Sequence, residues 1–260
     1  MLTCILLDVG GTLWPDAWPA PAKVSAARVA NLGAVLRAFG LNAALASVLQ
    51  QCLLAAMVEH ARQGRQSGSL IQDTASVVQG ALREVGLAPD PMVIAAIRRA
   101  MRVSPAGYAE LLPGARELPA AIRALDLGCV AISNAHWRDG DDYRQDFADL
   151  GVAHYFDAVI SSVDVGFNKP HRAMFDAALA AGGWRAAHCV MIGNSEHNDV
   201  EPARALSMRT ILVALEEDPP AVSSADDVAL TLADVAATLR AWVAAEAAAD
   251  PRQVVDDARH

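Results

Sequence analysis

Short, continuous apolar runs recur along the chain, separated by longer stretches in which apolar residues follow helical spacing. The runs do not alternate between polar and apolar positions, which is typical of strands in a sheet covered on both faces. Strands that alternate with helices predict an α/β fold with a parallel sheet. The predicted strands are TCILLDV (3–9), CVAIS (129–133), DAVISS (157–162), CVMIG (189–193) and TILVAL (210–215).

The interval between the first and second predicted strands is long and has no strand pattern. Its apolar residues follow helical spacing, Gly40 is a stop signal, and Asn42 can cap the helix that follows. A last helix is predicted at about 230–247, and the polar end beyond it is predicted to be disordered. The predicted organisation is an α/β core of residues 1–16 and 108–247, an inserted helical module of residues 17–107, and a tail of residues 248–260.

Charge and cysteine content narrow the range of partners and locations. The chain has 260 residues, a formal net charge of -9, and 21 lysines and arginines that form no basic run. We therefore expect no binding to nucleic acid or to an anionic membrane surface. The four cysteines show no CxxC spacing, and no apolar run approaches the ~20 residues of a membrane span. These features predict a soluble, cytoplasmic protein with reduced cysteines, and a homodimer is compatible with them.

Polar residues follow four of the five predicted strands. Because the carboxyl ends of parallel strands meet at one edge of a sheet, these residues are expected to lie together. Each group alone is weak evidence for an active site, but four groups in this order at the strand ends are strong evidence. They are Asp8 with Gly10, Gly11 and Thr12; Ser133 with Asn134; Lys169; and Asn194 with Asp199.

This set resembles the haloacid dehalogenase (HAD) superfamily over about residues 3–215, and the inserted helices resemble its C1 cap. The resemblance implies a HAD-like Rossmannoid core with a helical cap, and a Mg²⁺-dependent hydrolase acting on a small phosphorylated metabolite. In that family the first aspartate attacks the phosphoryl group and becomes esterified. The roles that the resemblance implies are catalytic for Asp8, Ser133 and Lys169; substrate-binding for Gly10, Gly11, Thr12 and Asn134; and metal-binding for Asp8, the carbonyl of Gly10, Asn194 and Asp199.

The chemistry of these residue types suits such roles. A carboxylate can form a covalent intermediate and divide one difficult step into two. Phosphoryl transfer depends mainly on neutralising charge on the transferring oxygens, which Lys169 and the hydroxyl of Ser133 would provide. Magnesium prefers oxygen ligands, which Asp8 and Asp199 carry.

Two positions depart from the family pattern. Most phosphatases of the superfamily have an aspartate two residues after the nucleophile, where this chain has Gly10. That aspartate protonates the leaving oxygen, and general acid–base help typically contributes roughly 10²–10⁴-fold. Asn194 stands where the first metal-binding aspartate is usual, and a neutral amide binds Mg²⁺ more weakly. Gly10 suggests a substrate with a good leaving group, or an altered reaction.

Other readings of the site stay open. Dehalogenases of the superfamily use no metal, have tyrosine at the second motif position, and carry a Ser-Asn pair like Ser133-Asn134. Phosphonatase-type members carry a small residue at that position and use a cap lysine, for which Lys23 is a doubtful match. A non-catalytic descendant that binds a phosphorylated ligand or a protein is a third reading. Within the phosphatase reading, we hypothesise that His136 or His197 partly replaces the missing aspartate.

Overall fold

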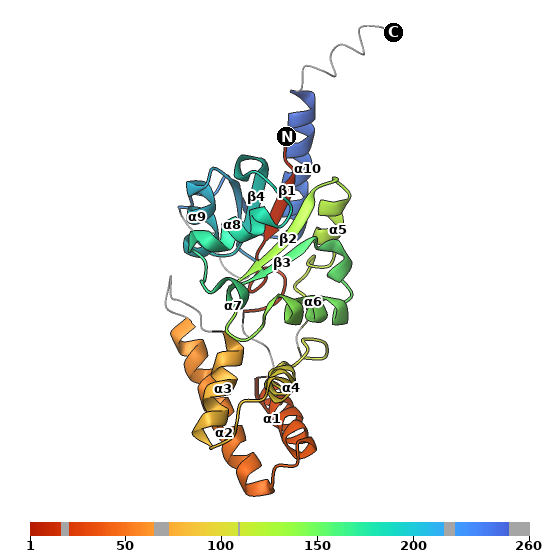
Figure 1. Ribbon diagram of the computed structural model, residues 1–260. Helices are drawn as coiled ribbons and strands as arrows, with labels where there is room; N and C mark the ends of the chain where they lie inside the picture. Colours follow the sequence, from red (N-terminus) through yellow and green to blue (C-terminus); the bar gives the residue numbers. More distant parts are fainter. Residues whose placement is uncertain (17–20, 65–72, 109, 216–221, 250–260) are drawn as a thin grey trace.

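The computed structural model describes residues 1–16, 21–64, 73–108, 110–215 and 222–249. It shows a core built on one parallel sheet, with a helical module at one end of it (Figure 1). The strand order is β3-β2-β1-β4-β5-β6, and every neighbouring pair is parallel, which confirms the predicted α/β class. The strands are β1 (Cys4–Leu7), β2 (Gly128–Ser133), β3 (Ala158–Ser161), β4 (Cys189–Gly193), β5 (Arg209–Val213) and β6 (Asp227–Ala229).

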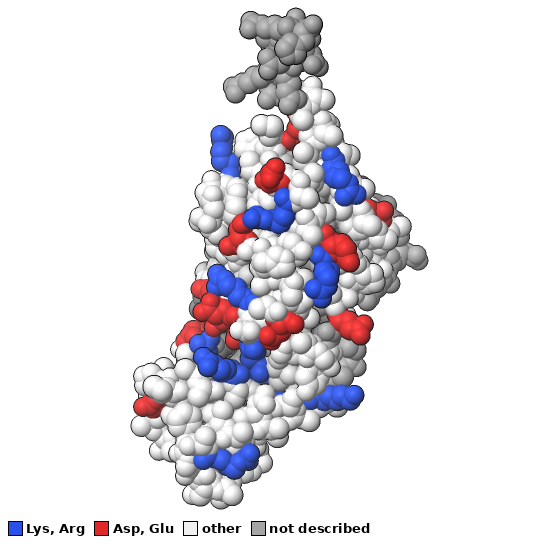
Figure 2. Space-filling view, turned by 90° about the vertical axis from the view of Figure 1, so that its right-hand side faces the viewer, with Lys and Arg blue, Asp and Glu red and all other residues white. Residues whose placement is uncertain are grey.

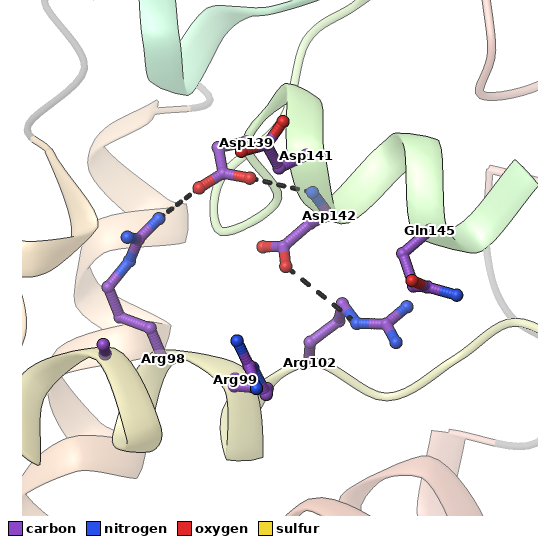
Figure 3. Close-up of a pocket in the computed structure, with 8 residues that line it drawn as sticks. Arg98, Arg99, Arg102, Asp139, Asp141, Asp142 and Gln145 are labelled. Atoms are coloured by element: carbon purple, nitrogen blue, oxygen red, sulfur yellow. Dashed lines mark hydrogen bonds and ion pairs between the residues drawn. The ribbon is translucent and has the colours of Figure 1, made fainter. Parts of the chain in front are cut away.

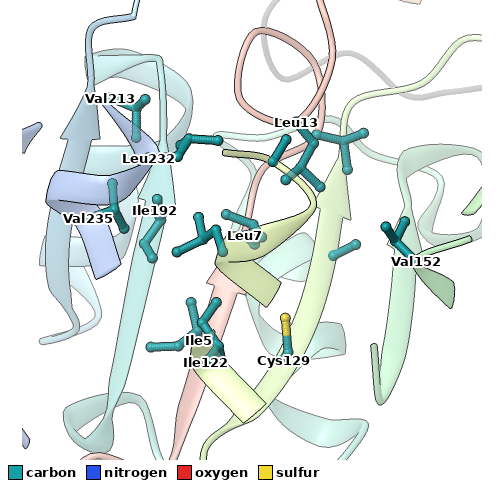
Figure 4. Packing of buried hydrophobic residues seen from close by; sticks show 14 of the residues in the cluster. Ile5, Leu7, Leu13, Ile122, Cys129, Val152, Ile192, Val213, Leu232 and Val235 are labelled. Carbon is teal, nitrogen blue, oxygen red and sulfur yellow. The ribbon is translucent and has the colours of Figure 1, made fainter. Parts of the chain in front are cut away.

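Burial on both faces of the sheet explains why the strands lack alternation. Successive side chains of a strand point to opposite faces. Ile5 and Leu7 of β1 lie in the cluster on one face, and Cys4 and Leu6 lie in the cluster on the other, with all four inaccessible to solvent. Figure 4 shows the first of these faces, where residues of β1, β4 and β5 lie near Val235 and its neighbours in the last helix.

Helices cover the two faces of the sheet. One face packs against α5, α6 and α10, and the other against α8 and α9. Thr231 caps α10 in a capping box with Asp234, so the predicted last helix is present within two residues of its expected bounds. Residues 250–260 of the predicted tail lie outside the described residues. The helices are α5 (Glu117–Arg123), α6 (Gly140–Asp149), α7 (Ser162–Val165), α8 (Arg172–Ala180), α9 (Glu201–Ala205) and α10 (Leu232–Ala248), with short turns at Ala153–Tyr155, Ala186–His188 and Glu196–Val200.

The long interval after β1 forms four helices with a buried cluster of their own. Asn42 caps the second of them, as predicted, by accepting a hydrogen bond from the backbone N–H of Leu45 at 3.0 Å. Among the described residues this second helix, α2, is long and apolar enough to cross a membrane, and its Leu49 and Leu53 are buried in the module. The helices are α1 (Pro21–Ala38), α2 (Ala43–Gly64), α3 (Thr74–Glu84) and α4 (Pro91–Met101).

Ion pairs join the module to the core between α4 and α6. Arg98 binds Asp139, and Arg102 binds Asp146, which is fully buried and also accepts from Arg138 at 2.6 Å. Figure 3 shows the arginines of α4 facing the aspartates of α6 across a cavity of about 510 Å³. In Figure 2 acidic and basic side chains gather where the module meets the core, while few are seen on the part of the module that faces the viewer. The two parts are therefore connected by charge as well as by the chain.

Candidate active site

The strand ends bring three of the predicted residues into one buried cluster. Asp8 follows β1, Lys169 lies in the loop after α7, and Asp199 lies in the turn after β4. The Nζ atom of Lys169 donates to Asp8 Oδ1 and to Asp199 Oδ1, both at 2.6 Å, and to the carbonyl oxygen of Ile132 at 3.2 Å. When both carboxylates are ionised, they and the one ammonium carry a net negative charge.

Burial and charge act against each other in this cluster. Burial and the nearby carboxylate of Asp8 raise the pKa of Asp199 to about 6, although the charge of Lys169 opposes them. For Lys169 burial alone would lower the pKa, but the two carboxylates outweigh burial and raise it above its ordinary value. The lysine is therefore held as a cation at neutral pH.

Each carboxylate is also held by a tight loop. The hydroxyl of Thr12 donates to Asp8 Oδ2 at 3.2 Å, and Gly11 turns the chain there with a φ of 69°. The backbone N–H of Ser195 donates to Asp199 Oδ2 at 3.0 Å. A Cβ at Gly193 would overlap the side chain of Asp199, so a glycine is required at this strand end.

Asn134 contacts a member of the cluster, whereas Ser133 is paired with a tyrosine of α6. Asn134 Oδ1 accepts from the backbone N–H of Lys169 at 2.6 Å, and its Nδ2 donates to the carbonyl oxygen of Lys169 at 3.0 Å. The hydroxyl of Ser133 is hydrogen-bonded to Tyr143 OH at 2.8 Å, and both groups are buried. Burial raises the pKa of Tyr143, so its phenol is protonated. The contacts of Asn134 are with Lys169, and its predicted contact with substrate stays a prediction.

Sequence reasoning overlooked Tyr143, which belongs to α6 and follows no motif. It overlooked Asp16 as well, which lies in the same loop as Gly10 and Gly11. The carboxylate of Asp16 lies where a side chain at residue 10 would begin: its Oδ1 is 2.8 Å from an ideal Cβ on Gly10. Its Oδ2 is 2.9 Å from an ideal Cβ on Gly11 and accepts from Asn194 Nδ2 at 3.5 Å. The signal available in the sequence was a second aspartate eight residues after Asp8.

The histidines named from the sequence have other neighbours. His197 is exposed and lies 3.6 Å from Glu201, an ion pair when the imidazole is protonated. Glu196 accepts hydrogen bonds from Ser223 and Ser224. The side chain of His60, in α2, hydrogen-bonds to the backbone of His136. The contacts described for these two histidines are with other residues, and the replacement of the missing aspartate by His136 or His197 stays a prediction.

The donors present suit Mg²⁺. This ion is usually bound by one or two carboxylates, completed by water and substrate phosphate oxygens, rather than by a closed protein cage. Asp8 and Asp199 are such a pair, and they carry one more charge than Lys169 neutralises. Within the described ranges, no three histidine, cysteine or acidic residues are grouped closely enough to hold a metal by themselves. The site could thus hold Mg²⁺ as an ion shared with substrate.

Family comparisons agree with this geometry. A family model of haloacid dehalogenase-like hydrolases matches residues 2–206, and a HAD-hydrolase-like model matches residues 166–258. The chain therefore belongs to the haloacid dehalogenase-like hydrolases. The phosphoserine phosphatase of Thermus thermophilus is 31% identical over 153 residues, or 56% of this chain and 57% of that protein. The glyceraldehyde 3-phosphate phosphatase of Methanothermobacter thermautotrophicus is 40% identical over 67 residues, or 26% of this chain and 30% of that protein. Both matches span less than two thirds of the relative's length.

Solved structures show the same fold. A 2-haloacid dehalogenase from Pseudomonas syringae superposes with a TM-score of 0.62 at 20% identity, over 93% of this chain and 100% of that one. A HAD phosphatase from Thermococcus onnurineus superposes with a TM-score of 0.55 at 16% identity, over 92% and 98%. At such identities the likeness establishes the fold alone, since function depends on the site.

Proposed function

We propose that this hydrolase is a Mg²⁺-dependent phosphatase that transfers the phosphoryl group of a small phosphorylated metabolite to Asp8. The observation that carries the proposal is Lys169 Nζ, held 2.6 Å from both Asp8 and Asp199. A cation fixed beside a carboxylate nucleophile can neutralise the phosphoryl oxygens during transfer. The phosphatase names of the curated relatives support the same chemistry.

The reaction divides into two displacements at phosphorus. In the first, an oxygen of Asp8 bonds to phosphorus while the bond to the leaving oxygen breaks. In the second, a water oxygen bonds to phosphorus and the bond to Asp8 breaks, which releases inorganic phosphate. Thr12 orients the carboxylate of Asp8, and Lys169 lowers the charge repulsion that Asp8 would meet. When bound by Asp8 and Asp199, Mg²⁺ would add positive charge at the phosphoryl oxygens.

The helical module is proposed to act as a cap over this site. Asn168, next to Lys169, donates to the carbonyl oxygen of Gly64 at the end of α2. Trp137, from the loop after β2, is buried in the cluster of the module. Both contacts join the module to loops at the strand ends that carry the site, where closure would exclude water and select the substrate.

The test is phosphate release from a panel of alkyl monophosphates, 4-nitrophenyl phosphate and an acyl phosphate, each with Mg²⁺ and with EDTA. We expect release that requires Mg²⁺ and is lost in Asp8→Asn. The matched control is Asp176→Asn, which changes an exposed aspartate paired with Arg172 on α8. Halide release from 2-haloacids without metal would support the dehalogenase reading instead. Tight phosphate binding without any turnover would support a binding protein.

A further inference from the structure

We propose that Asp16 is the catalytic acid and base that position 10 of the motif lacks. The inference rests on the proposed phosphatase function and concerns the same site. The usual motif has its second carboxylate at the start of the loop, at the position that Gly10 occupies here. In this chain Asp16, at the end of the same loop, would supply that carboxylate.

The geometry shows that Asp16 and a side chain at residue 10 would occupy the same space. Asp16 Oδ1 lies 2.8 Å from an ideal Cβ on Gly10, closer than real Cβ atoms come to such an oxygen. The other oxygen lies 2.9 Å from an ideal Cβ on Gly11. Glycine at residue 10 therefore leaves the space in which the carboxylate of Asp16 lies. Glycine at residue 11 leaves space for Asn194 first, whose Nδ2 is 2.0 Å from the ideal Cβ there, and for Asp16 as well.

A neighbouring amide lies at the outer limit of hydrogen-bond distance from this carboxylate. Asn194 Nδ2 donates to Asp16 Oδ2 at 3.5 Å, from the loop that also leads to Asp199. The two departures from the family pattern, Gly10 and Asn194, are thus both neighbours of Asp16. Gly10 leaves space for the carboxylate and Asn194 donates to it, so both departures fit an acid that lies later in the loop.

The position of Asp16 makes it accessible. Asp16 is exposed at the surface of the loop, where a leaving group could reach it. Asp8 and Asp199, in contrast, are buried and each binds Lys169. A carboxyl group there can carry a proton to the leaving oxygen without displacing the lysine.

The proton follows a balanced path. As Asp8 bonds to phosphorus and the bond to the leaving oxygen breaks, the carboxyl group of Asp16 gives its proton to that oxygen and the alcohol departs. Water then gives a proton to the carboxylate of Asp16 as its oxygen bonds to phosphorus and the bond to Asp8 breaks. Inorganic phosphate leaves, and both side chains return to their starting states.

The test compares leaving groups in Asp16→Asn. An alkyl leaving group needs a proton, whereas 4-nitrophenolate needs almost none, and kcat/KM reports the steps up to its departure. We expect kcat/KM for the fastest alkyl monophosphate of the panel to fall by roughly 10²–10⁴-fold. For 4-nitrophenyl phosphate we expect a fall of less than about tenfold, since acid help matters little to so good a leaving group. Asp176→Asn should change neither value.

Equal losses with both substrates would show a structural role for Asp16 and overturn the inference, and so would the absence of any loss. Wild-type turnover of 4-nitrophenyl phosphate alone would overturn it too, because no acid would be at work, but would leave the phosphatase function intact. Turnover that survives Asp8→Asn would instead overturn the proposed function.

Rescue by the double variant Gly10→Asp/Asp16→Ala provides a second measurement. Asp16→Ala removes the side chain that would overlap residue 10, so a carboxylate starting from residue 10 should raise the alkyl kcat/KM at least tenfold above that of Asp16→Ala. A double variant no faster than Asp16→Ala would overturn the claim that the two residues share one catalytic place.

Discussion

Asn134 holds the backbone of Lys169 from both sides, accepting from its N–H at 2.6 Å and donating to its carbonyl oxygen at 3.0 Å. A residue of the second strand end thus sets the position of the ammonium group that joins Asp8 to Asp199. Lys169 is the one predicted site residue that contacts residues from three other strand ends among those the structure describes: Asp8, Asn134 and Asp199. Substitution of Asn134 therefore tests whether the position of Lys169 matters for activity.

Replacing Asn134 by alanine removes both hydrogen bonds and frees the loop that carries Lys169. Because small displacements of a catalytic group are costly, we expect kcat to fall by about 10–10²-fold. The free energy of unfolding should fall by about 1–3 kcal/mol, the worth of two hydrogen bonds. The control is Asn42→Ala, which removes a helix cap far from the site and should cost about 1 kcal/mol with kcat unchanged. Equal kcat values in both variants would contradict the positioning role.

Replacing Gly193 by alanine tests the packing of Asp199 against the end of β4. An added Cβ would overlap the carboxylate and would lie 2.8 Å from the Cβ of Asp199, so Asp199 or the strand end must move. We expect a loss of kcat of about 10²-fold or more, as for a misplaced catalytic group. Gly80→Ala in α3 is the matched control, since nothing lies within 4 Å of its added Cβ. It should stabilise the protein by about 0.5–1 kcal/mol through helix propensity, with unchanged kcat.

Asp142, on α6, should make the stability of the protein depend on pH. Burial, followed by the charge of Asp139, raises the pKa of Asp142 to about 6, although Arg102, Arg98 and Arg138 oppose the shift. The folded state therefore retains this proton between about pH 4 and pH 6, while the unfolded chain loses it. The contribution of Asp142 to stability is present below pH 4 and is lost as the pH rises through 6, by at most about 3 kcal/mol.

The measurement is urea unfolding of wild type and Asp142→Asn at pH 4, 5, 6 and 7.5. The variant should lose less stability than wild type as the pH rises from 4 to 7.5. Asp141→Asn is the control, because the neighbouring Asp141 is 93% exposed and pairs only with Arg144 in the contacts described. Identical slopes for wild type and Asp142→Asn would refute the raised pKa.

The ion pairs of Asp146 should contribute measurably to holding the module on the core. Asp146 is fully buried between Arg102 and Arg138, so Arg102→Met leaves a buried carboxylate with one partner instead of two. We expect unfolding free energy to fall by about 1–3 kcal/mol. Arg144→Met removes an exposed pair on the same helix and should cost less than about 1 kcal/mol. Equal effects of the two substitutions in denaturant melts would contradict the proposed contribution.

Much of the fold was predictable because it depends on local pattern. The residues of β1 and β4 are buried on both faces, and such burial requires the continuous apolar runs that the sequence shows. The short strand β6 was not predicted, because its three residues begin with Asp227 and have no apolar run. It forms through pairing with β5, aided by Asp226, whose carboxylate accepts from the backbone N–H of Thr210 at 2.8 Å.

The sequence by itself determined the family, the parallel core and the set of strand-end residues, because hydrophobic period and motif order are local properties of the chain. Only the tertiary structure decided which of those residues touch. It joined Asp8 and Asp199 through Lys169, turned Asn134 toward the backbone of Lys169, and brought Asp16 over Gly10. Such contacts depend on how loops from separate strands fold back on one another. Spacing along the chain carries no information about that geometry.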